Sequence, residues 1–184
     1  MKALTIAMAL AISVAGCAGQ DLTAEGPDAE EMQEAKTEAN QTLAEMKKKD
    51  PGIQKFVDGA YGYAIFPSVG RGGLIVGGMS GDGWVFEKGQ LVGSTGVTKV
   101  TVGAQAGGES FSQVIFFEDA TSMNRFKRGD LELGAQVSAV ALKNGAAARA
   151  GYTQGMAIFT MTKTGLMAEA SVGGQKFSFT PIGQ

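Results

Sequence analysis

Residues 62–77 read Gly-Tyr-Ala-Ile-Phe-Pro-Ser-Val-Gly-Arg-Gly-Gly-Leu-Ile-Val-Gly. Short apolar runs stand between glycines here, and similar runs separated by glycine continue to the end of the chain. This pattern is typical of β-strands joined by turns. Of the 28 glycines, 25 lie from residue 51 onward. The sequence therefore predicts a glycine-rich β domain over residues 51–184.

Ten strands are predicted in this domain, and one helix interrupts them. Apolar and polar residues alternate most clearly over 131–142 and 166–172. Gly173-Gly174 follows the second of these runs, as in a two-residue hairpin. The helix is predicted over 119–128, with Gly129 as its stop. The predicted strands are 62–66, 73–77, 83–87, 91–93, 97–104, 110–117, 131–142, 156–162, 166–172 and 176–180.

The predicted fold class is mostly β (α+β), a compact antiparallel barrel or sandwich with an N-terminal amphipathic helix and one or two short helices. Inward-facing glycine and alanine let strands approach closely and curve sharply, as a small barrel or sandwich requires. Glycine-zipper helices are the alternative, because 73–77 and 103–107 both fit Gly-x-x-x-Gly. Neither segment lies inside a 20-residue apolar stretch, so strands are favoured.

Residues 28–50 are predicted to form a separate N-terminal helix. Asp28 with Glu31 three residues later is a capping-box pattern. Lys47-Lys48-Lys49 ends the helix, where basic residues suit the helix dipole. The apolar residues recur at helical spacing, at Met32, Ala35, Ala39, Leu43 and Met46. This face is weakly apolar, so we expect it to pack on the domain rather than enter a bilayer.

Residues 1–16 are predicted to be a lipoprotein signal peptide. After Met1-Lys2, residues 3–14 form an apolar run too short to span a membrane. Val14-Ala15-Gly16-Cys17 resembles a bacterial lipobox, in which the cysteine thiol takes the lipid. Cys17 is the one cysteine of the chain. It is therefore the predicted lipid attachment site.

The lipobox also predicts a location. Ala18 follows the cysteine, where aspartate would favour retention in the inner membrane. We therefore expect a lipid anchor in the outer membrane of the bacterial envelope, facing the periplasm. Residues 17–27 are predicted to be a polar tether between the anchor and the helix.

Composition excludes several classes of protein. The chain has no histidine and one cysteine. Ser-His-Asp and Cys-His catalysis, histidine metal sites, an internal disulfide and multi-cysteine metal sites are thus excluded. A formal charge of −2 argues against nucleic acid as a partner. Residues 70–73 lack the Lys-Ser/Thr of a phosphate loop. We predict no enzyme activity, no cofactor and no metal.

The strongest basic feature of the β domain is the cluster Arg125, Lys127 and Arg128. Together with Lys55 and Arg71, these residues are candidate contacts for anionic lipid headgroups, to which each cation near a membrane surface contributes about 1 kcal/mol. The alternative is an ordinary solvated helix end that follows the dipole rule. The sequence leaves both interpretations open.

Several motifs together resemble the SYLF domain family over residues 51–182. In chain order they are Tyr63-Ala64-Ile65-Phe66-Pro67, Gly72-Gly73, Val76-Gly77-Gly78, the run 102–107, the strand 114–117 and Gly165-Leu166-Met167-Ala168. The resemblance implies a lipid-binding domain, which in eukaryotic members binds phosphoinositides and in yeast members also actin. The chain departs from the pattern at Gln90-Leu91-Val92-Gly93, where many relatives have aromatic residues, and its first helix is acidic. Phosphoinositide and actin binding are therefore not carried over.

Two functions follow from these observations. The first is a non-enzymatic envelope lipoprotein whose SYLF-like domain binds lipid or the membrane surface, with anionic lipid as the partner. The second is a lipid-anchored periplasmic module that binds an envelope protein and does not read lipid. A basic surface beside apolar residues would favour the first function, and an exposed apolar patch with no basic rim the second.

Overall fold

The computed structural model describes residues 28–73, 76–102, 108–131, 138–164 and 174–182. The predicted signal peptide, Cys17 and the predicted tether lie outside these residues. The helices are α1 (Ala29–Lys49), the 3-10 helix η1 (Pro51–Ile53), α2 (Gln54–Gly59), α3 (Ala120–Lys127) and α4 (Ala146–Arg149). The strands are β1 (Gly62–Gly73), β2 (Val76–Glu87), β3 (Gln90–Val102), β4 (Gly108–Phe117), β5 (Val140–Ala141), β6 (Met156–Thr164) and β7 (Lys176–Pro181).

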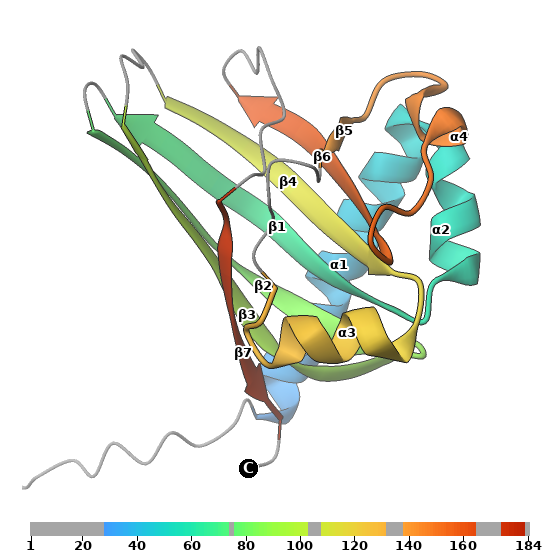
Figure 1. Cartoon of the computed structure of the whole chain (residues 1–184). Helices are drawn as coiled ribbons and strands as arrows, with labels where there is room; N and C mark the ends of the chain where they lie inside the picture. The colour runs from blue at the N-terminus through green and yellow to red at the C-terminus, as the bar shows by residue number, and fades with distance from the viewer. Residues whose placement is uncertain (1–27, 74–75, 103–107, 132–137, 165–173, 183–184) are drawn as a thin grey trace, which may run out of the picture.

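All seven strands belong to one sheet, in the order β5-β6-β4-β1-β2-β3-β7. Every pair is antiparallel except β5 with β6. Helix α3 lies over one face of the sheet, and α1, α2 and α4 lie over the other (Figure 1). The prediction of a mostly β fold with an N-terminal helix is confirmed. One or two short helices were predicted, and the described residues contain α2, α3, α4 and the 3-10 helix η1.

The sheet curves around the side chains beneath α3. Gln113 on β4 and Gln175, just before β7, exchange two amide hydrogen bonds of 3.0 Å. Three strands separate β4 from β7 in the sheet, so a flat sheet would hold them about 19 Å apart at about 4.8 Å per strand. The curvature resembles that of a barrel, but β5 and β7 are edge strands of an open sheet among the described residues. The described sheet is therefore strongly curved but is not a closed barrel.

Each face of the sheet carries an apolar core. On the face covered by α3, called here the α3 face, Phe66, Ile115 and Phe117 pack with Phe126 of the helix. On the opposite face, called the α1 face, apolar side chains pack with α1, α2 and α4. These include Ile65, Val114, Phe116 and Phe159 of the strands and Leu43, Met46 and Phe56 of the helices. The strands therefore alternate between two apolar cores.

Helix α1 begins as the sequence predicts. The Asp28 side chain accepts hydrogen bonds from the backbone N–H groups of Glu30 and Glu31, both at 2.9 Å. The Glu31 side chain accepts from the Asp28 N–H in return, which completes the capping box. Ala35, Ala39, Leu43 and Met46 are buried against the sheet, whereas Met32 is only partly buried. The helix packs on the domain, as expected.

Glycines caused most of the errors in the predicted strands. The predicted segment 91–93 and residues 97–102 of the predicted segment 97–104 belong to one strand, β3, whereas residues 103–104 lie outside the described residues. The segment 73–77 contains the end of β1 and the start of β2. Of 131–142, only Val140–Ala141 is a described strand; residues 132–137 and 166–172 lie outside the described residues. Gly83 and Gly93 lie inside strands in contact with neighbouring backbone, rather than in turns. Helix α4 was not predicted.

Among the described residues, no helix combines the length and the apolar character needed to cross a bilayer.

Candidate functional site

The five predicted headgroup contacts do not form one patch. Arg125, Lys127 and Arg128 lie on or just after α3, and Lys55 lies on α2. Arg71 lies near the far end of β1, opposite Glu109 of β4. From Glu109, β4 runs eight residues to Phe117, just before α3, which is about 26 Å at about 3.3 Å per residue. The structure thus separates an α3 group from Arg71.

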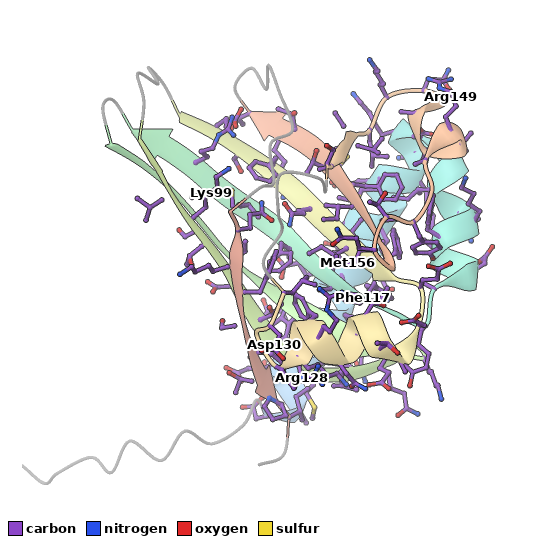
Figure 2. All side chains as sticks on the ribbon, viewed as in Figure 1. Lys99, Phe117, Arg128, Asp130, Arg149 and Met156 are labelled. Atoms are coloured by element: carbon purple, nitrogen blue, oxygen red, sulfur yellow. The ribbon has the colours of Figure 1, made fainter. Side chains whose placement is uncertain are left out.

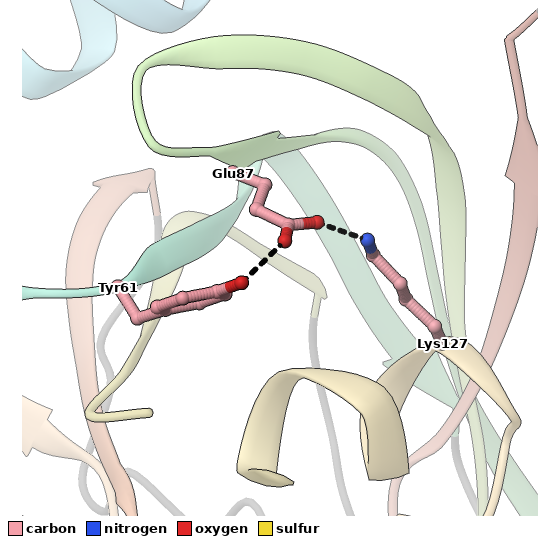
Figure 3. Close-up of polar contacts among 3 residues, drawn as sticks. All are labelled: Tyr61, Glu87 and Lys127. Carbon is pink, nitrogen blue, oxygen red and sulfur yellow. Dashed lines mark hydrogen bonds and ion pairs between the residues drawn. The ribbon is translucent and has the colours of Figure 1, made fainter. Parts of the chain in front are cut away.

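At the α3 end, Lys127 takes part in a polar network (Figure 3). Lys127 forms an ion pair with one carboxylate oxygen of Glu87, and the Tyr61 hydroxyl donates a 2.7 Å hydrogen bond to the other. The Lys127 hydrogen bond, followed by that of Tyr61, holds the pKa of Glu87 below its ordinary value. Glu87 in turn raises the pKa of Tyr61. Lys127 therefore has an internal partner before any ligand arrives.

The other two cations of this group differ in their pairing. Arg128 makes a 2.8 Å ion pair with Asp130, and both side chains are more than half exposed. Such an exposed pair contributes little to stability and leaves the guanidinium accessible. Among the described residues, Arg125 makes no ion pair. Arg125 and Arg128 are therefore the cations of α3 that can meet a ligand.

Lys55 has a structural role. Its Nζ donates hydrogen bonds to the carbonyl oxygens of Ala148 and Ala150, at 3.0 and 2.9 Å. These carbonyls lie at the end of α4, where a positive charge suits the helix dipole. Lys55 also lies 4.8 Å from the ring centroid of Phe56. Lys55 therefore links α2 to the end of α4. A lipid headgroup would have to compete with these two hydrogen bonds.

At the other end of the sheet, Arg71 pairs with Glu109. Lys99 of β3 lies on the same face of the sheet, since Met79 of β2 is paired with both Arg71 and Lys99. Burial lowers the pKa of Lys99, and the positive charge of Arg71 lowers it further. Two cations and one carboxylate thus gather where α3 does not reach.

The described residues contain no group of three or more His, Cys, Asp or Glu side chains placed to hold a metal ion.

Residues 98–180 match the family model for Ysc84, described as the Las17-binding protein actin regulator. This match identifies residues 98–180 as similar to the Ysc84 (SYLF) family. The match to the Ysc84-family model begins in β3, includes α3, and ends in β7. Lys99 and the α3 cations lie within it, whereas Lys55, Arg71 and Glu87 precede it.

The chain is also similar to a bacterial protein. Beta cell expansion factor A of Aeromonas veronii is 31% identical over 144 residues, which are 77% of this chain and 54% of the relative. The chain therefore spans about half the length of that relative.

Sequence reasoning identified Arg71 but missed Lys99 and Glu109. The sequence did contain an indication for Lys99. Lys99 lies two residues after Val97 in a predicted strand, so both side chains are on the same face, and Val97 is buried. Glu109 offered no comparable signal, because its pairing with Arg71 depends on the register between β1 and β4. Register between strands distant in sequence is a tertiary property.

Substituting Glu87 tests the network at the α3 end. Glu87→Gln is expected to lower the free energy of unfolding by about 1 kcal/mol at pH 7. This is less than a fully buried charged hydrogen bond contributes, because Glu87 and Lys127 are partly exposed to solvent. Because the folded pKa of Glu87 is lowered, its contribution is fully present above its ordinary pKa and is lost as pH falls through the folded value. The difference from wild type should shrink below about pH 4. Urea unfolding between pH 3 and 8 measures it, and a difference independent of pH would contradict this account.

Proposed function

We propose that this chain is a non-enzymatic envelope lipoprotein whose Ysc84-family domain binds the surface of an anionic membrane. The observation that carries the proposal is the end of α3, where Arg125 has no ion-pair partner among the described residues and Arg128 is more than half exposed. Similarity to the SYLF family supports a lipid-binding role. Membrane charge attracts such cations within about 8 Å at physiological salt.

The proposal includes an anchor at Cys17. Lipid attached to this thiol would hold the chain in the outer membrane, facing the periplasm, and the tether to residue 27 would let the domain reach the bilayer surface. Several acyl chains on Cys17 would make a stable anchor, and the basic surface would hold the domain against the bilayer. The absence of histidine from the chain supports a role without catalysis.

A second candidate function is binding to an envelope protein, with the lipid serving only as an anchor. One observation favours it: Arg71, Lys127 and Arg128 already pair with carboxylates of the chain. This pairing reduces the charge available to a membrane. The family description, which names binding of the protein Las17, also supports a protein-binding role.

Flotation with vesicles distinguishes the two functions. The chain from residue 17 with Cys17→Ser is mixed with vesicles of phosphatidylcholine alone or with added phosphatidylglycerol or cardiolipin, at low and high salt. We expect flotation only with the anionic vesicles, weakened by salt. Arg125→Ala with Arg128→Ala should lower apparent affinity about thirtyfold, from about 1 kcal/mol for each of the two charges.

The matched control is Lys47→Ala with Lys48→Ala, which removes the same charge from the end of α1. This pair should leave flotation nearly unchanged. Equal losses in both double variants would mean that net charge, not the α3 surface, governs binding. No flotation with any vesicle would contradict membrane binding and favour a protein partner.

A further inference from the structure

A row of four side chains crosses the sheet at the end away from α3. Register pairs Glu109 on β4 with Arg71 on β1, Arg71 with Met79 on β2, and Met79 with Lys99 on β3. Directly paired residues point to the same side of a sheet. Figure 2 labels Lys99 at this end and Arg128 at the other.

This row lies on the α3 face. Val69 and Val97, two residues before Arg71 and Lys99, both belong to the core on that face, as does Met79. Residues two apart in a strand share a face. The charged side chains therefore lie next to the apolar core of the α3 face, at the end of the sheet that α3 does not cover.

The charges in the row do not balance. Glu109 has a side chain only 8% exposed and pairs with Arg71, whose side chain is 21% exposed. Lys99 makes no ion pair among the described residues. Two cations face one carboxylate, so the row carries one net positive charge in a partly buried setting. Charge in such a setting is costly unless it is paired.

The two cations affect each other. The positive charge of Arg71 contributes to lowering the pKa of Lys99, after burial. Their backbones are two strand spacings apart, about 10 Å at about 4.8 Å each. Both side chains are long enough to reach an anion placed between them above Met79. An anion there would offset the repulsion and neutralise the row.

We propose that Arg71 and Lys99 bind one singly charged oxyanion of the phosphodiester class above Met79. Glu109 sets the preference for a single charge, because its buried carboxylate offsets one of the two cations and would repel a dianion such as a phosphomonoester. The inference deepens the proposed membrane function, on which it rests in part, by naming the headgroup chemistry that the domain recognises. This site also differs from the exposed α3 surface, which would attract anions without distinguishing singly from doubly charged ones.

Two sources of this chemistry are separable by experiment. The chain from residue 17 with Cys17→Ser is titrated with soluble glycerophosphoglycerol, and in parallel with inorganic phosphate at pH 8, while NMR follows the amide and side-chain signals of Lys99. Flotation with phosphatidylglycerol in phosphatidylcholine vesicles measures the lipid form. Lys99 signals should shift with glycerophosphoglycerol and scarcely with inorganic phosphate.

Three variants give the expected pattern. Lys99→Gln should weaken affinity for phosphatidylglycerol vesicles about fivefold, the effect of one charge near the surface. Glu109→Gln should strengthen it about fivefold and allow inorganic phosphate to shift the Lys99 signals. Lys163→Gln is the matched control and should change little, because Lys163 is an exposed lysine at the bulge of β6 and makes no ion pair among the described residues. Thermal unfolding of each variant confirms that it is folded.

The outcomes separate the two proposals. Equal losses in Lys99→Gln and Lys163→Gln would overturn the site and leave membrane binding in place. Weaker binding by Glu109→Gln in a folded protein would also overturn it, because the carboxylate would then be required rather than opposing. Shifted Lys99 signals with glycerophosphoglycerol but no flotation would support the site and contradict membrane binding. No shift and no change on flotation would overturn the site.

Discussion

Gly83→Ala is expected to destabilise the protein by about 2–3 kcal/mol. Gly83 lies inside β2, and a Cβ built there would meet the Phe66 ring at 2.7 Å and the Ile65 carbonyl oxygen more closely still. These atoms belong to β1, which is held by β2 on one side and β4 on the other. The strand cannot move aside without losing ladder hydrogen bonds. Overpacking of this kind costs about 1–3 kcal/mol.

Gly70→Ala is the matched control for this prediction. Gly70 lies inside β1, has no positive φ, and a Cβ there would have nothing within 4 Å. Alanine should therefore be neutral or stabilise the fold by up to about 1 kcal/mol, through the unfolded state. Urea unfolding of both variants measures the difference. Equal effects would mean that the glycines act through strand propensity rather than through close approach.

This contrast shows why glycine misled the sequence analysis. Gly83 is in close contact with a neighbouring strand, whereas Gly70 has open space beside it. Both positions are glycine, so the sequence does not distinguish these two environments. Turn signals rely on glycine at positive φ, which holds at Gly89, Gly129 and Gly174 but not at these two. The predictions of short strands ended by glycine were therefore wrong wherever a strand continued through it.

Local signals predicted the elements well. The capping box at Asp28 and the apolar spacing of α1 lie within a few residues of each other, so the sequence alone contains them. The same holds for β4 and β6, which contain the apolar runs 114–117 and 156–159. Helix α4 carries no such signal: it is four residues long, and its N-cap Gly145 makes no side-chain cap.

Tertiary pairing limited the prediction of curvature and of the site. An open sheet and a closed barrel have similar strand patterns, and only contacts such as Gln113 with Gln175 show how far the sheet bends. The cations of the site were recognised singly, but their partners Glu87, Glu109 and Asp130 were not assigned to them. The sequence could name the charges but could not say which were already paired.

The junction of α1, η1 and α4 depends on a single buried carboxylate, Asp50. The residue is fully buried, and its two oxygens accept hydrogen bonds from the N–H groups of Gly52 at 3.0 Å and Ala147 at 2.7 Å. Its own N–H donates to the Met46 carbonyl and so caps α1. Asp50 therefore joins segments almost a hundred residues apart in the chain.

Asp50→Ala is expected to lower the free energy of unfolding by about 3 kcal/mol, because two buried N–H groups lose a charged acceptor and gain none. Burial raises the pKa of Asp50, but backbone N–H groups led by those of Ala147 and Gly52 lower it below its ordinary value. The contribution is thus fully present above about pH 4 and is lost as pH falls through the folded pKa. Urea unfolding at pH 7 and pH 3 measures it.

Asp58→Ala is the matched control, since Asp58 is exposed and its carboxylate accepts one hydrogen bond, of 2.7 Å from the Gln54 side chain. That change should cost less than about 0.5 kcal/mol at either pH. Asp50→Asn should lower the free energy of unfolding less than Asp50→Ala at pH 7, because the amide retains one acceptor oxygen. Some loss remains, because the NH₂ group then faces one of the two backbone N–H donors. If Asp50→Ala cost no more than Asp58→Ala, α4 would be held by Lys55 and apolar packing alone, and the carboxylate would not join it to α1.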